Sequence, residues 1–121
     1  MASPPTAPVP TAFDVLRTRY SKRLPARLED LTGPTQGTVD LPLHVVWSGR
    51  RSYQLEGIRS RMSLYRTVLA EGQREDLEAF LNRDLLISQW PVLRSLVSRP
   101  LRDAWEAAFP QLAASRAASA A

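Results

Sequence analysis

The chain has 121 residues, of which sixteen are basic and twelve acidic, so its formal net charge is +4. This length suits one domain, and the charge is smaller than most dedicated nucleic-acid-binding domains carry. No cysteine is present, which excludes a disulfide framework, a thiolate metal site and a thiol nucleophile, and fits a cytoplasmic protein. The apolar runs all stay well below the roughly 18 residues that a membrane-spanning helix needs, so we expect no membrane partner.

Composition divides the chain into three parts. Residues 1–11 are rich in proline and are expected to form a disordered leader, whereas residues 111–121 are mostly alanine and serine and are expected to form a disordered tail. Residues 12–110 are the expected single globular domain. The first residues have neither a basic start nor an apolar run, so they do not resemble a signal peptide, which again favours a cytoplasmic location.

The first predicted helix spans residues 12–23. Apolar side chains recur at helical spacing, and Pro25 ends the pattern. Pro25 can begin one short helical turn up to Leu31. Residues 32–37 are rich in glycine, proline and threonine and are expected to form a loop.

A two-stranded hairpin is predicted next. Apolar residues occupy every second position of this segment, as in a strand with one buried face: Val39, Leu41, Leu43, Val45 and Trp47. Pro42 cannot donate a ladder hydrogen bond, so we expect an edge strand. Ser48, Gly49 and Arg50 are the predicted turn, and residues 51–55 the returning strand.

From Gly57 onward the period becomes helical and predicts four or so short helices. The first is expected to end at Gly72, the second covers residues 74–81, and a kink or restart is expected at Pro91 in the third. Ser98 is the expected N-cap of the last helix. The fold class is therefore α+β: an α-rich single domain with one N-terminal helix, a two-stranded hairpin and then these helices. Its expected core contains Trp47, Leu69, Phe80, Trp90 and Trp105.

The residues that carry chemistry give no support for an enzyme. His44 is the only histidine, and its position on the polar side of the predicted strand favours an ordinary surface side chain. Glu75, Asp76 and Glu78 fall in the first turns of a predicted helix, where the helix dipole favours negative charge, so we interpret them as solvated. No glycine-rich phosphate loop is present. We therefore predict no catalytic residue, no cofactor and no metal site.

An arginine cluster is the one candidate binding surface. Five arginines fall within residues 50–66, where Glu56 is the only acid. The predicted partner-binding residues lie at the turn, in the returning strand and on one face of the next helix: Arg50, Arg51, Tyr53, Arg59 and Arg66.

Three interpretations of this cluster stay open. It can bind an anionic partner protein, which makes the chain a small regulatory or accessory module. Alternatively, it can bind DNA or RNA through phosphates. A third interpretation is ordinary solvated surface, balanced by ion pairs with the acidic segment after Gly72. A helix-turn-helix is not favoured, because the segment from Leu85 to Leu93 is too apolar to read base edges. The identity of the partner and the oligomeric state are left undetermined.

Overall fold

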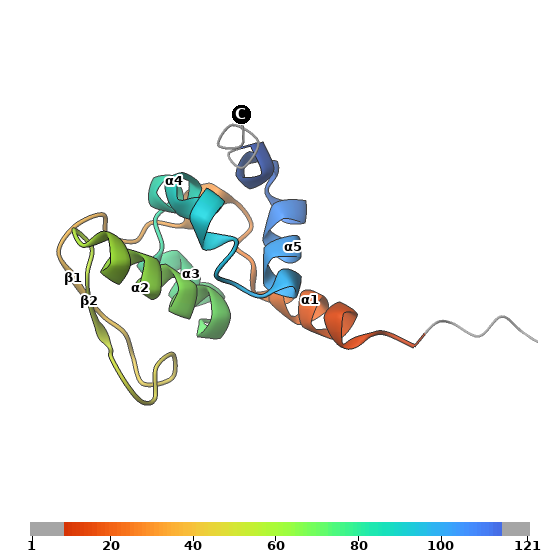
Figure 1. The fold of residues 1–121 in the computed structure, drawn as a ribbon, viewed down its shortest axis with the longest axis horizontal. Coiled ribbons are helices and arrows are strands. Elements are labelled where there is room, and N and C mark those ends of the chain that lie inside the picture. Colours follow the sequence, from red (N-terminus) through yellow and green to blue (C-terminus); the bar gives the residue numbers. More distant parts are fainter. Residues whose placement is uncertain (1–8, 115–121) are drawn as a thin grey trace, which may run out of the picture.

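A computed structural model describes residues 9–114 of the chain; residues 1–8 and 115–121, where most of the expected leader and tail fall, lie outside this range (Figure 1). The domain is α+β, as predicted. Its elements in chain order are α1 (Ala12–Arg23), the 3-10 turn η1 (Leu28–Asp30), β1 (Thr38–Asp40), β2 (Ser52–Gln54), α2 (Ile58–Glu71), α3 (Arg74–Phe80), α4 (Arg83–Leu93) and α5 (Arg99–Ala108). No helix within residues 9–114 has the length and apolarity that crossing a membrane would require.

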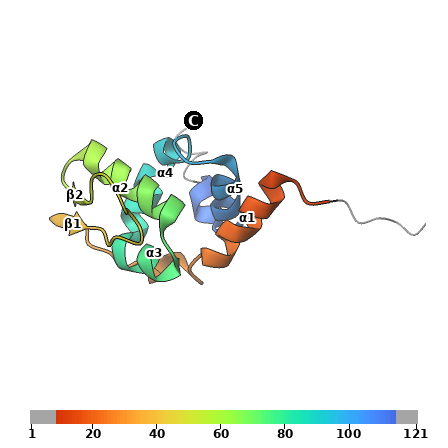
Figure 2. The same cartoon turned by 90° about the horizontal axis from the view of Figure 1, so that it is seen from below.

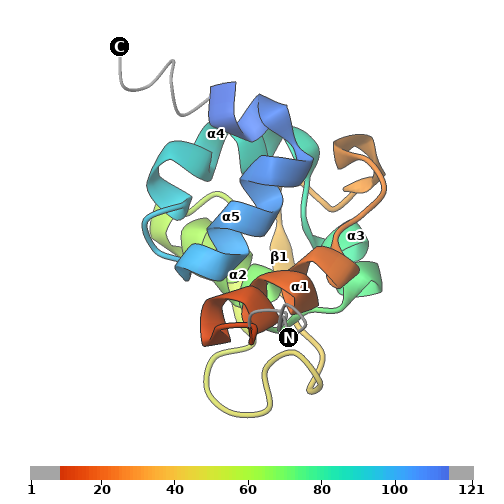
Figure 3. The same cartoon turned by 90° about the vertical axis from the view of Figure 1, so that its right-hand side faces the viewer.

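The elements are arranged along one long axis. Figure 2 shows the hairpin of β1 and β2 at one end, α2, α3 and α4 in the middle, and α1 with α5 at the other end. Seen from that other end, α1 lies across α5 (Figure 3). The hairpin rests on α2, and the chain between its strands extends away from the helices. The segment with the predicted binding residues therefore lies at the edge of the domain.

The helix α1 has the predicted bounds but only a shallow contact with the rest of the domain. It begins at a capping box, in which the Thr11 hydroxyl accepts from the Asp14 amide at 3.1 Å and the Asp14 carboxylate accepts from the Thr11 amide at 3.2 Å. None of its residues is fully buried. Arg17 pairs with Asp103 of α5. Arg74 of α3 donates to the carbonyl oxygens of Lys22 and Leu24 at 2.8 and 2.9 Å, which satisfies two acceptors at the end of α1.

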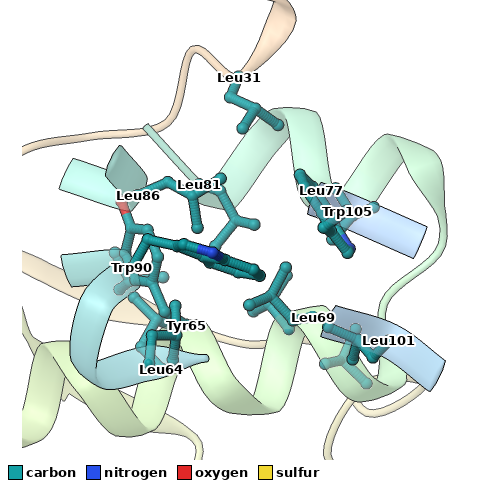
Figure 4. Close-up of a cluster of buried hydrophobic side chains, with 14 of the residues drawn as sticks. Leu31, Leu64, Tyr65, Leu69, Leu77, Leu81, Leu86, Trp90, Leu101 and Trp105 are labelled. Atoms are coloured by element: carbon teal, nitrogen blue, oxygen red, sulfur yellow. The ribbon is translucent and has the colours of Figure 1, made fainter. Parts of the chain in front are cut away.

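The core combines side chains of α2, α3, α4 and α5 with others from the loops, the hairpin and the end of the described chain (Figure 4). Leu69, Trp90 and Trp105 are buried in it, as predicted. Phe80 is only partly buried. The prediction for Trp47 was wrong, because this side chain lies at the surface.

One carboxylate joins α4 and α5 at the edge of this core. An oxygen of Glu106 accepts from the indole nitrogen of Trp90 at 2.9 Å and from the Nε of Arg94 at 2.8 Å. The side chains of Arg94 and Glu106 are both mostly buried. A buried indole N–H needs an acceptor, and the acid in turn needs a positive charge nearby. The indole N–H, the guanidinium and the carboxylate therefore satisfy one another's hydrogen-bonding and charge requirements at the contact between α4 and α5.

The hairpin is much shorter than the alternating pattern predicted. Three residue pairs form its ladder, from Thr38 opposite Gln54 to Asp40 opposite Ser52. After Asp40 the chain turns, and the carbonyl of Pro42 accepts from the amides of Val45 and Val46 at 3.0 and 3.1 Å. Pro42 has no N–H for a ladder, so the following backbone groups are satisfied locally instead. The expected tight turn at residues 48–50 is in fact part of a long loop, residues 41–51.

The helical boundaries follow the sequence closely, with two differences. No restart occurs at Pro91: α4 continues through it to Leu93. A further helical turn covers residues 110–114, and Leu112 in it is completely buried. The packed part of the chain therefore extends beyond residue 110, where the expected globular domain ended. Asn82 caps α4 by accepting from the amides of Asp84 and Leu85.

Gly33 allows two segments distant in sequence to cross. Its amide donates to the carbonyl of Leu81 at 2.8 Å, and Thr32 donates to Glu78 at 3.0 Å. A Cβ atom at Gly33 would lie 2.5 Å from the carbonyl carbon of Phe80, closer than real Cβ contacts come. The loop before β1 is thus held against the end of α3 by backbone contacts that only a glycine permits.

We expect Gly33→Ala to lower the free energy of unfolding by about 1–3 kcal/mol, because the backbone of Phe80 cannot move aside as a flexible side chain would. Chemical denaturation measures the change. Gly57→Ser is the control, since Gly57 is the N-cap of α2 and serine suits that position. Equal stability of the Ala variant and the wild type would contradict the close contact.

Candidate partner-binding surface

The loop of residues 41–51 is held in place by one polar contact with α3. The Nε2 atom of His44 lies 2.9 Å from both carboxylate oxygens of Asp76. Asp76 also accepts from the amide of Gln73 at 2.9 Å, which closes the first turn of α3. Asp76 does begin the helix, as predicted, but it is buried rather than solvated. His44 is accordingly a surface side chain with a defined partner that ties the loop to the domain.

Trp47 is the most exposed large hydrophobic side chain of this loop. It is 85% exposed and borders a depression of about 450 Å³ between the loop and α2. Val45, Val46 and Tyr53 contribute to the wall, and Arg66 and Ala70 of α2 lie opposite. An indole exposed next to arginines is typical of residues that dominate protein interfaces. Sequence reasoning missed Trp47 because its phase in the alternating pattern assigned it to the core, although Pro42 already indicated that the strand could not continue.

Arg50 and Tyr53 stabilise the hairpin rather than projecting from it. The guanidinium of Arg50 donates to the carbonyl of Ser52 at 2.8 Å and to the hydroxyl of Ser60 at 3.1 Å. Its central carbon lies 5.3 Å from the centre of the Tyr53 ring, a cation–π distance. Tyr53 is only 5% exposed, and its hydroxyl donates to the carbonyl of Arg50 at 3.0 Å. These two predicted residues fix the shape of the site from within.

Three of the predicted arginines are available to a partner. For the side chains of Arg51, Arg59 and Arg66 the structure of residues 9–114 records no hydrogen bond and no ion pair, and all three residues are exposed. The fifth arginine of the cluster, Arg61, is half-buried and donates to the carbonyl of Leu55 at 3.1 Å. The cluster therefore consists of two arginines that hydrogen-bond within the domain, Arg50 and Arg61, and three exposed arginines for which residues 9–114 record no such contact.

The four predicted arginines lie on one connected surface. Arg50 borders the Trp47 depression and also a second depression of about 500 Å³, which Arg51 borders as well. Arg66 borders the Trp47 depression and a third one of about 270 Å³, which it shares with Arg59. We call this area, comprising Trp47, Arg50, Arg51, Arg59 and Arg66, the Trp–Arg surface.

The acids near this surface do not neutralise its three exposed arginines by direct contact. Of the acids in α3 and α4, Asp76 contacts His44 and Asp84 pairs with Arg83. Glu71 borders the Trp47 depression, and no acid of residues 9–114 borders the other two. The interpretation of the cluster as surface balanced by ion pairs with the segment after Gly72 thus finds no such pair in the described chain.

Glu56, the only acid among the five arginines, has a structural contact instead. Its carboxylate accepts from the amide of Gly37 at 2.8 Å, at the start of β1. This hydrogen bond, together with one from its own backbone amide, holds the pKa of Glu56 below its ordinary value of 4.5. Gly37 has a φ of 90°, a conformation that glycine adopts without strain. Glu56 thus fastens the base of the hairpin.

Comparison of the chain with protein-family models, curated proteins and solved structures found no significant match. Within residues 9–114, no three histidine or acidic side chains gather closely enough to hold a metal ion.

Because folding lowers the pKa of Glu56, its contribution to stability is present above pH 4.5 and is lost as the pH falls through the lowered value. We expect Glu56→Gln to melt below the wild type at neutral pH, and the gap in Tm to shrink on acidification below pH 4.5. Thermal melts of both proteins across this range make the comparison. A difference in Tm that stays constant at every pH would show that the ionised carboxylate of Glu56 does not stabilise the fold.

We expect His44→Ala to loosen the loop without unfolding the domain. The pair with Asp76 is largely exposed on the histidine side, so its loss should cost no more than about 1 kcal/mol. Hydrogen exchange of the Val45 and Val46 amides, which bond to Pro42, should become faster. Leu43→Ala is the matched control, since Leu43 is the exposed neighbour of His44. Equal exchange in both variants would show that the histidine does not hold the loop.

Proposed function

We propose that this protein is a small, non-enzymatic regulatory or accessory module that binds an acidic partner protein through the Trp–Arg surface. The observation that carries the proposal is the exposure of Trp47 next to Arg66, on a surface whose arginines Arg51, Arg59 and Arg66 have no recorded partner within residues 9–114. A cytoplasmic location belongs to the same proposal and fits the absence of cysteine.

The exposed indole supports a protein as the partner. Leaving a side chain of this size in water forgoes about 1.5–3 kcal/mol of burial free energy, which a partner that covers it would recover. Tryptophan and arginine are the residue types most enriched among those that carry binding energy in protein interfaces. Trp47, which borders the depression together with Arg66, gives such a partner an apolar contact next to the charges.

The charge of the surface supports an acidic partner. Arg51, Arg59 and Arg66 present guanidinium groups that form paired hydrogen bonds with carboxylates. Burying three such charges against an uncharged surface would leave them unsatisfied and would be unfavourable. A partner with carboxylates at matching positions removes that penalty, and the attraction also increases the rate of association.

Nucleic acid is the alternative partner, and one observation favours it: the exposed ring of Trp47 offers a platform on which a base can stack, and the exposed arginines can contact phosphates. The second aromatic residue of the predicted site does not add a stacking platform, because Tyr53 is buried under Arg50. Single-strand binding usually uses several exposed rings, so the surface supports a protein better.

The proposal contains no catalytic step. His44, the single histidine, uses Nε2 to contact Asp76, and within residues 9–114 the structure records no serine or threonine hydroxyl bonded to its ring. A general base for nucleophilic catalysis would need such a contact or one through water.

The test is affinity capture from an extract of the source organism, with and without nuclease, followed by binding of the purified partner. We expect a protein to be captured in both conditions and the variant Trp47→Ser/Arg51→Gln/Arg59→Gln/Arg66→Gln to lose at least tenfold in affinity. Arg50 is left intact, because it holds the hairpin. Arg19→Gln, an exposed arginine of α1, is the control. Capture of nucleic acid alone would favour the alternative, and unchanged affinity of the variant would overturn the proposed site.

A further inference from the structure

The outer face of α2 carries two depressions that meet at one arginine. The Trp47 depression touches α2 at Arg66 and Ala70, and the third depression touches it at Arg59 and Met62. Arg66 borders both. The two depressions therefore adjoin along the helix with Arg66 between them, and we call them together the track.

Each end of this track has an apolar wall that comes from another part of the chain. At one end Val46 and Trp47 of the loop face Ala70. At the other end Leu96, which is 43% exposed in the turn between α4 and α5, lies beside Met62. An apolar site at Met62 and Leu96 and a mixed site, in which Trp47 and Ala70 lie next to polar groups that include Glu71, thus lie on either side of Arg66. Arg66 has no recorded partner within residues 9–114.

The spacing of these sites matches an extended peptide. Met62 and Ala70 are eight residues apart on α2, which corresponds to about 12 Å along the helix axis. An extended chain covers this distance in about four residues, at about 3.3 Å each. Side chains at positions i, i+2 and i+4 of an extended chain point to the same side. Arg66 lies halfway between Met62 and Ala70 along α2. It therefore lies opposite position i+2 of such a peptide.

We propose that the track binds an extended acidic segment of the partner protein with the pattern apolar-x-Glu/Asp-x-apolar. The two apolar side chains occupy the depressions at Trp47 and at Leu96, and the central carboxylate pairs with Arg66. This inference rests on the proposed function and specifies the chemistry of its ligand. Duplex nucleic acid does not fit this arrangement, because it offers phosphates but no apolar side chain for the wall at Leu96.

The first experiment uses synthetic peptides with the core Leu-Ser-Glu-Ser-Leu between glutamates. A rearranged peptide of the same composition has its leucines three residues apart, which places them on opposite sides of an extended chain. Binding is followed by chemical shifts in NMR spectra up to millimolar peptide, so that weak affinity is still measured. We expect the matched peptide to bind at least tenfold more tightly than the rearranged one. Equal affinities, or no binding by either peptide, would overturn the proposal.

The second experiment assigns the contacts. Arg66→Gln should abolish the preference for glutamate over glutamine at the central position, and Leu96→Ser should weaken the matched peptide at least fivefold. Arg19→Gln is expected to leave both the preference for glutamate and the affinity for the matched peptide unchanged. Because Arg66 is exposed and Leu96 partly so, the variants should stay folded, which thermal melts verify. An unchanged preference in Arg66→Gln would contradict the central pair even if the peptide binds.

The outcomes also separate this inference from the proposed function. A captured partner that depends on Trp47 and Arg51 but is indifferent to Arg66→Gln and Leu96→Ser would leave the proposed function standing and overturn the track. A matched peptide that binds as expected, combined with capture of nucleic acid only, would support the track and overturn the acidic partner protein as the physiological ligand.

Discussion

Burial of one face of α2 fixes the direction of every residue on its other face. Leu64, Tyr65, Val68 and Leu69 are buried between the helices. A helix that buries positions 64, 65, 68 and 69 must direct positions 59, 63 and 66 away from the core. The hydroxyl of Tyr65 also accepts from the amide of Asn82 at 2.9 Å, and burial raises the pKa of this tyrosine to about 12. Rotation of α2 would break this contact and bury arginines, so the core sets the geometry of the Trp–Arg surface.

The helices could be predicted from the sequence because their signals are local. Pro25 marks the end of α1, Ser98 the start of α5, and the apolar positions between such residues repeat with the helical period. The loop of residues 41–51 could not be predicted in the same way. Its alternating pattern favours a strand, whereas the contact between His44 and Asp76 joins residues 32 positions apart and leaves no trace in the local pattern. Where a distant contact decides the conformation, periodicity alone gives the wrong phase, and Trp47 was placed in the core for this reason.

The candidate site, too, could be predicted from the sequence only in part. A cluster of arginines with one acid could be recognised by counting residues, and the structure brings the predicted members onto one surface. Counting could not separate the arginines that serve the fold from those that face solvent. Arg50 and Arg61 donate to backbone carbonyls, whose positions depend on the turn of the hairpin rather than on nearby side chains. Nor could it show that Glu56, the one acid among these arginines, accepts from the amide of Gly37.

Arg74 shows how a contact between a side chain and backbone atoms determines which positions can be substituted. Its guanidinium holds the end of α1 by two carbonyl oxygens, those of Lys22 and Leu24. Every amino acid has a carbonyl oxygen, so the side chain of Lys22 can change without loss of its bond, whereas position 74 needs a long, forked donor. Among related sequences, we therefore expect substitutions to be frequent at the end of α1, whereas position 74 is expected to remain arginine.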